Sequence, residues 1–173
     1  MLNVSINALV PKPHTPFQWV AQEKEDQLLK KFNHIVKAVR SRNVSCRFPD
    51  TRLLLLEAVF SRGDRRLGDV IEEAFRKGCK FDSWQDYFNF ESWQESFQKH
   101  NLTMSFYAHR EREKDEIMPW DLIDCGVERQ YLWREWEKAL QGISTDDCRL
   151  IKCQGCGLES VCADTGFSGN EKI

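Results

Sequence analysis

Four cysteines fall within fifteen residues of this sequence, and this cluster constrains the possible fold more than any other feature. They are spaced C-x4-C-x2-C-x5-C and are Cys148, Cys153, Cys156 and Cys162. A thiolate quartet suits zinc or an iron–sulfur cluster, because both take sulfur ligands in a tetrahedral array. Gly155 and Gly157 lie within the segment, and glycine lets the backbone wrap closely around a bound group. We therefore predict a metal centre held by these four cysteines.

The spacing of the cysteines does not decide between zinc and an iron–sulfur cluster. Structural zinc sites commonly pair two C-x2-C units, and this segment contains a single one, Cys153 to Cys156. The opening C-x4-C-x2-C spacing is typical of plant-type 2Fe–2S sites, although their fourth cysteine lies farther along the chain. We favour an iron–sulfur cluster, with zinc as the alternative. A segment of free thiols is the third interpretation.

The composition predicts a cytoplasmic globular chain. Of 173 residues, 41% are hydrophobic and 30% charged, and the net charge of −2 indicates no nucleic-acid partner. The apolar run Leu53–Leu56 is too short to span a bilayer, and the first twenty residues lack the pattern of a secretory signal. Cytoplasmic thiols stay reduced, so clustered cysteines favour a metal over disulfides, as does the odd total of seven.

Apolar periodicity predicts a mainly helical chain with one or two short strands. The expected helices are residues 23–40, 53–60, 67–77 and 127–140. Residues 82–100 should form two short helical pieces around an aromatic core that includes Phe81, Trp84, Tyr87, Trp93 and Phe97. We expect residues 104–124 to be irregular. Asp50 or Thr51 should cap the second helix, and the residues that should stop helices are Gly63, Gly78 and Gly142.

The first residues predict a strand without an obvious partner. Residues 4–10 alternate in the manner of a strand, and the second strand candidate, residues 44–48, is short. Two short strands make a poor sheet, so we expect the first strand to belong to a larger sheet elsewhere. The chain then divides into residues 1–22 with the strand and a proline-rich loop, 23–143 as the helical region, and 144–173 as the cysteine segment with a flexible tail.

The proline-rich loop, residues 11–16, is a second candidate site. Its three prolines fix the backbone and remove hydrogen-bond donors, so the loop is stiff and non-helical. Lys12 and His14 could bind a carboxylate, a phosphate or a substrate, because α/β barrels place site residues in the loops that follow their strands. The alternative is a rigid connector whose side chains are solvated.

Four segments resemble, in order, the C-terminal portion of a family of radical S-adenosylmethionine (SAM) proteins with an N-terminal cobalamin-binding domain. They are "NVSINALVPKPHTPFQW" (3–19), "EAVFSRGDRRLGDVIEEAFRKGCKFDSW" (57–84), "PWDLIDCGVERQYLWREWEKAL" (119–140) and "DCRLIKCQGCG" (147–157). The resemblance implies that the first strand is the last strand of a partial (β/α)6 barrel. It also implies that Lys12, Pro13 and His14 face the SAM and substrate end.

The sequence departs from this family in two ways. Cys162 lies five residues after Cys156, where the family's fourth cysteine comes about two residues after the third. The C-x3-C-x2-C loop that binds the SAM cluster, a 4Fe–4S cluster, is absent, as are the rest of the barrel and the cobalamin domain. The resemblance therefore implies a fragment that does not cleave SAM alone, with SAM and cobalamin bound only in the complete protein.

Three functions follow from these observations. The first is a C-terminal segment of a radical SAM protein with an accessory iron–sulfur cluster and, as partner, the missing barrel and cobalamin-binding portion on a separate chain. The second is a zinc-stapled helical module that binds another protein without catalysis. The third is a redox thiol protein using Cys153 and Cys156, which ranks last because no βαβ pattern precedes the pair.

Overall fold

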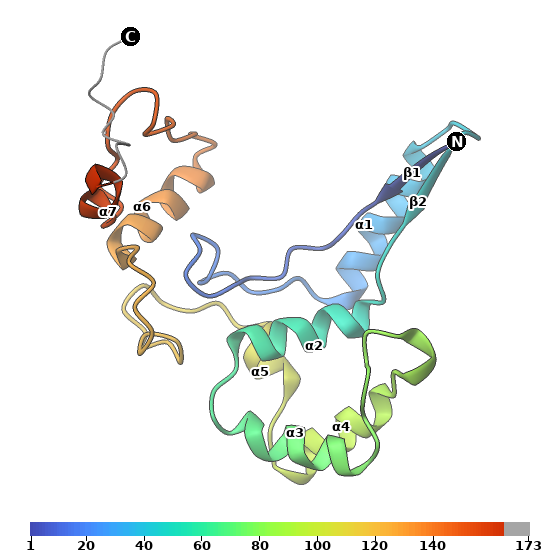
Figure 1. Ribbon diagram of the computed structural model, residues 1–173. Coiled ribbons are helices and arrows are strands. Elements are labelled where there is room, and N and C mark those ends of the chain that lie inside the picture. The colour runs from blue at the N-terminus through green and yellow to red at the C-terminus, as the bar shows by residue number, and fades with distance from the viewer. Residues whose placement is uncertain (165–173) are drawn as a thin grey trace. The chain divides into compact units, whose positions relative to one another are not determined.

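The computed structural model describes residues 1–164, and this part of the chain is mainly helical, as predicted (Figure 1). The final residues of the predicted flexible tail lie outside the described residues. In the described part, no helix has the length and apolar character needed to cross a membrane. The elements, in order, are β1 (Leu2–Ser5), α1 (Glu25–Ala38), β2 (Val44–Arg47), α2 (Thr51–Arg62), α3 (Leu67–Arg76), the 3-10 helix η1 (Gln85–Tyr87), α4 (Phe90–Lys99), α5 (Met104–Ala108), α6 (Arg129–Leu140) and α7 (Glu159–Asp164).

The chain forms two compact units. The N-terminal unit comprises Met1–Lys12 and Val20–Arg112. The C-terminal unit comprises Pro13–Trp19 and the described part of Glu113–Ile173. The proline-rich loop is therefore shared, because Lys12 belongs to the first unit and the residues after it belong to the second.

The two strands of the N-terminal unit pair with each other. β1 and β2 are parallel, with Leu2 opposite Val44 and Ser5 opposite Arg47, and α1 connects them along the chain. The expectation that no βαβ unit precedes the cysteine segment is therefore wrong. The predicted strand over residues 4–10 is wrong in its bounds. The last hydrogen bond between β1 and the β2 segment is donated by the N–H of Ile6 to the carbonyl of Arg47. Pairing ends there because the chain after β2 turns through Pro49 into α2. The alternation of apolar and polar residues over positions 4–10 therefore did not predict which residues pair with β2.

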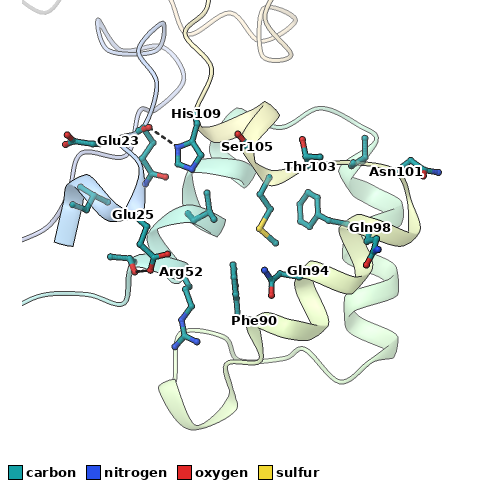
Figure 2. Close-up of a pocket in the computed structure, with 17 residues that line it drawn as sticks. Glu23, Glu25, Arg52, Phe90, Gln94, Gln98, Asn101, Thr103, Ser105 and His109 are labelled. Carbon is teal, nitrogen blue, oxygen red and sulfur yellow. Dashed lines mark hydrogen bonds between the residues drawn. The ribbon is translucent and has the colours of Figure 1, made fainter. Parts of the chain in front are cut away.

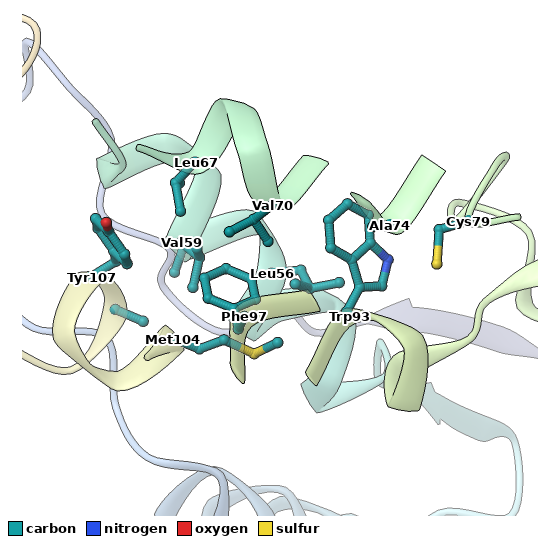
Figure 3. Close-up of a cluster of buried hydrophobic side chains, with 12 residues drawn as sticks. Leu56, Val59, Leu67, Val70, Ala74, Cys79, Trp93, Phe97, Met104 and Tyr107 are labelled. Carbon is teal, nitrogen blue, oxygen red and sulfur yellow. The ribbon is translucent and has the colours of Figure 1, made fainter. Parts of the chain in front are cut away.

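The hydrophobic core of the N-terminal unit lies among α2, α3, α4 and α5 (Figure 3). Its most deeply buried members are the side chains of Ala58, Val59, Val70, Ala74, Tyr107 and Ala108. The predicted cap of α2 is confirmed, since the Asp50 carboxylate accepts from the N–H of Arg52 at 2.8 Å. At the other end of α2, the buried guanidinium of Arg62 donates to the carbonyls of Val20 and Arg110. This arginine holds two distant loop segments against the core.

The aromatic core predicted for residues 82–100 is present only in part. Trp93 is 5% exposed and Phe97 3%, both on α4, whose start is capped by Asn89. Phe81, Trp84 and Tyr87 are 64%, 61% and 63% exposed, so their predicted burial is wrong. The single turn of η1 is too short to present an apolar face to the core.

A short helix stands where the sequence predicted irregular structure. α5 buries Met104, Tyr107 and Ala108, which follow the i, i+3, i+4 spacing of one helical face. Five residues are too few to show a period in the sequence, and contact with α2 stabilises the turn. The prediction of irregular structure was therefore wrong for residues 104–108.

The C-terminal unit has its own smaller core around α6. Its buried members are Trp19, Met118, Trp120 and Leu132. The side-chain oxygen of Gln18 accepts from the indole N–H of Trp120 at 2.7 Å and from the N–H of His14 at 3.2 Å. This glutamine ties the second half of the proline-rich loop to the tryptophan core.

Candidate functional site

The cysteine segment forms a loop beside the start of α6, and its backbone turns at two glycines with positive φ, Gly155 and Gly157. The N–H of Glu128 donates to the carbonyl of Cys156 at 2.8 Å, and Arg134 Nη2 donates to the carbonyl of Gly155 at 3.0 Å. Gly157 has a φ of 100°, and a Cβ there would lie 2.8 Å from the carbonyl oxygen of Gly126. Glycine is thus required at this position by both conformation and space.

The four predicted metal ligands all lie in this segment. Cys148 and Cys153 are exposed, Cys156 and Cys162 are half-buried, and none of the four forms a disulfide in the described part of the chain. Partial burial raises the pKa of Cys162, and the nearby sulfurs of Cys156, Cys148 and Cys153 raise it further. Negative charge on any of the other three sulfurs therefore disfavours the charged form of Cys162.

The chemistry of this donor set fits a thiolate-bound metal. No three His, Cys, Asp or Glu side chains of the described residues already stand at metal-ligand spacing, so binding requires the thiols to move closer. Four reduced sulfurs suit zinc or an iron–sulfur cluster, and a cation offsets the repulsion between neighbouring thiolates. Cys148, Cys153, Cys156 and Cys162 would hold the group. A cluster would supply electron transfer, and zinc would supply a structural cross-link.

Glu159 is a polar neighbour that the sequence analysis did not single out. Its Oε1 accepts from the N–H of Gly157 at 3.2 Å and from the thiol of Cys153 at 3.7 Å. Backbone hydrogen bonds, its own N–H first and then that of Gly157, lower the pKa of this carboxyl. The carboxylate holds the loop where α7 begins, six residues beyond Cys153.

The structure places the residues of the proline-rich loop in different settings. Lys12 Nζ lies 2.6 Å from Glu57 Oε1 and 2.9 Å from Ser61 Oγ, on the surface of α2. His14, in the C-terminal unit, adopts a φ of 54°, and its buried Nε2 has no hydrogen-bond partner among the described residues. Pro13 begins the C-terminal unit. The predicted role of this trio in cofactor binding stays a prediction.

A pocket in the N-terminal unit was missed by the sequence analysis (Figure 2). It has a volume of about 690 Å³, within the range of small-molecule sites. Phe90, Phe97 and Met104 contribute to its apolar wall, and His109 and Gln94 lie at its polar rim. These residues come from separate elements and share no sequence motif. Only the packing of α1, α2, α4 and α5 brings them together.

Comparisons with known proteins show limited similarity. No family model matches the chain, and no solved structure matches it. The uncharacterized protein MJ0966 of Methanocaldococcus jannaschii is 25% identical over 71 residues, which make up 41% of this chain. The matched stretch is 16% of that protein's length, and its name states no activity.

Proposed function

We propose that this chain is the C-terminal segment of a radical SAM iron–sulfur protein of the family that carries a cobalamin-binding domain. In this proposal it works in the cytoplasm, binds an accessory iron–sulfur cluster, and does not cleave SAM alone. The feature that supports the cluster is the set of four cysteines, Cys148, Cys153, Cys156 and Cys162, on a segment whose backbone turns at Gly155 and Gly157, both with positive φ. The assignment to the family rests on the four ordered motifs of the sequence.

The sheet supports a partner that supplies the rest of a barrel. β1, α1 and β2 make one βαβ unit, which is the repeating unit of α/β barrels. Within the described residues neither strand pairs with a third, and parallel sheets usually have more strands and covered faces. Strands of the missing portion would pair with the free edge of β1, and β2 adds one parallel strand beyond the one that the resemblance makes the last of the barrel. SAM and cobalamin would bind in that missing portion.

The proposal gives the chain's own residues defined tasks. Cys148, Cys153, Cys156 and Cys162 would hold the cluster, and Glu128 and Arg134 would hold the loop through its carbonyls. Lys12, Pro13 and His14 would face the SAM end of the completed barrel. The bound cluster would supply electrons or a substrate-binding iron.

A zinc-stapled interaction module is the second candidate. The hydrogen bonds that join Gly155 and Cys156 to α6 support it, because a structural staple cross-links a loop to a helix. The exposed aromatic rings of Phe81, Trp84 and Tyr87 would then be available to a protein partner. This function needs the same four thiols and no electron transfer.

Metal analysis after anaerobic expression separates the two candidates. Iron and sulfide in matched amounts, with charge-transfer absorbance, are expected from the first, and about one equivalent of zinc without iron from the second. The double substitution Cys153→Ala and Cys156→Ala should abolish binding of either. Cys125→Ala, which removes an exposed cysteine of the same unit, should leave metal content unchanged. Full metal content in the double variant would contradict both candidates.

A further inference from the structure

The pocket of the N-terminal unit has an apolar floor, and neutral polar side chains line one side of its opening (Figure 2). Phe97 and Met104 on the floor are at most 9% exposed, and the ring of Phe90 lies beside them. Exposed amide and hydroxyl side chains line one side of the pocket opening. These rim residues are Gln94, Gln98, Asn101, Thr103 and Ser105, and no hydrogen bond joins their side chains to others in the described residues.

The charged side chains at the opening already have partners within the unit. Glu23 pairs with Lys31 at 2.5 Å, and Arg52 pairs with Asp50 at 2.6 Å. Glu25 accepts from the hydroxyl of Thr51 at 2.5 Å. A charged ligand would have to compete with these contacts, so the opening favours a neutral one.

His109 presents a hydrogen-bond acceptor of fixed orientation to this pocket. Its Nδ1 lies 3.0 Å from the carbonyl oxygen of Gln22, and a carbonyl only accepts, so Nδ1 carries the hydrogen. In the neutral ring Nε2 is then an acceptor, and Figure 2 shows this second nitrogen on the pocket side.

Gln22 is itself held in place by two further bonds. Its side-chain amide donates to the carbonyl of Leu54 at 2.9 Å, and its N–H donates to the carbonyl of Ala108 at 2.8 Å. The carbonyl that orients His109 therefore belongs to a buried, doubly anchored residue. Such support reduces the conformational freedom that a ligand would have to remove on binding.

We propose that this pocket binds a neutral small molecule with a flat apolar body and one N–H or O–H donor, which Nε2 of His109 accepts. The class comprises N–H heteroaromatic and phenolic compounds. Aromatic rings on the floor favour a flat body, and the unpaired amides and hydroxyls of the rim suit further neutral polar groups. The site lies wholly in the N-terminal unit and does not depend on the cysteine segment.

The test uses indole and 1-methylindole, which differ in the N–H donor. Millimolar indole should shift the amide resonances of Gln94, Gln98 and His109 in a titration of the full chain followed by NMR. 1-Methylindole should bind roughly fivefold more weakly, the ratio expected from one lost hydrogen bond. His109→Phe should remove the preference for indole, and His109→Gln, which restores an acceptor, should recover part of it. His34→Phe on the exposed surface of α1 is the matched control.

Two results would overturn the proposal. One is equal affinity of the two probes for the unchanged protein, since the donor would then have no acceptor in the pocket. The other is the absence of shifts at the pocket residues while either probe is present at millimolar concentration. If His109→Phe proves unfolded, the affinities of the two probes for the unchanged protein and for His109→Gln still test whether position 109 accepts the hydrogen bond.

Discussion

The core of the N-terminal unit and the cysteine segment of the C-terminal unit are held together by different means. In the first, side chains from four helices exclude water, and Val59, Val70 and Ala74 are fully buried. In the second, Cys148 and Cys153 are exposed, and a few hydrogen bonds hold the loop to α6. Burial of apolar area stabilises the first region, and the second has little such area to bury.

This difference implies different sources of stability for the two regions. A loop with exposed thiols and little apolar contact gains most from a bound cation, as small metal-binding segments do. The helical core should be indifferent to metal and sensitive to any cavity. The following changes test that contrast, from the largest expected effect to the smallest.

Replacing both Cys153 and Cys156 by Ser should abolish metal binding by the segment completely, in comparison with the metal-loaded unchanged protein. Bound metal should fall to background, and trypsin should cleave after the exposed Arg149 and Lys152 at least roughly tenfold faster, because the loop loses its cross-link. Limited proteolysis with mass spectrometry measures this. The unfolding of the N-terminal unit should not change, and an equal loss of stability there would refute the contrast.

Trp93→Ala should produce the largest loss in the helical core. The indole is 5% exposed, its ring lies 5.2 Å from that of Phe60, and its N–H donates to Asp82 at 3.2 Å. The cavity should lower the free energy of unfolding by about 3–5 kcal/mol, measured by urea denaturation. Trp84→Ala, at a tryptophan 61% exposed, is the control and should cost less than about 0.5 kcal/mol.

Gly157→Ala should disturb the cysteine loop without touching a thiol. The new Cβ would meet the Gly126 carbonyl oxygen at 2.8 Å, at a φ of 100° that L residues rarely adopt. We expect a local cost of about 2–3 kcal/mol and weaker metal retention in a chelator competition. Gly142→Ala, with a φ of 68° and no atom within 4 Å of the new Cβ, should cost only about 1–2 kcal/mol and leave metal retention intact. Equal metal retention in both variants would show that the loop shape does not matter.

Asp50→Ala should give the smallest effect, about 1 kcal/mol from the lost cap of α2. The pKa of Asp50 is held below its ordinary value of 3.8, chiefly by the side-chain hydrogen bond from Arg52. A lowered folded-state pKa stabilises the fold above pH about 4, and this contribution disappears as pH falls through the folded pKa.

Asn at position 50 caps a helix as well as Asp and does not titrate, so Asp50→Asn isolates the ionised group. The stability difference between this variant and the unchanged protein should be small at neutral pH and should disappear as the pH falls through the lowered folded-state pKa of Asp50. Thermal unfolding followed by circular dichroism across this range measures it. A difference that grows on acidification would contradict the assigned sign.

Features that local forces determine were predicted correctly from the sequence. Asp50 and Gly63 bound α2, and Gly142 follows the end of α6, as the cap and stop residues predicted. The strand predicted over residues 4–10 was wrong in its bounds because pairing with β2 decides where β1 ends, and α5 was missed because five residues are too few to show a helical period.

By itself, the sequence determined the helical character of this protein, most of its helix ends and the positions of the four cysteines of its last segment. Capping bonds, glycine dihedrals and cysteine spacing act within a few residues, so they can be read along the chain. Only the tertiary structure decided that Trp93 is buried and Trp84 exposed, and that His109 meets Gln22 beside an apolar floor. Those outcomes depend on contacts between residues far apart in the chain, whose energies no local pattern contains.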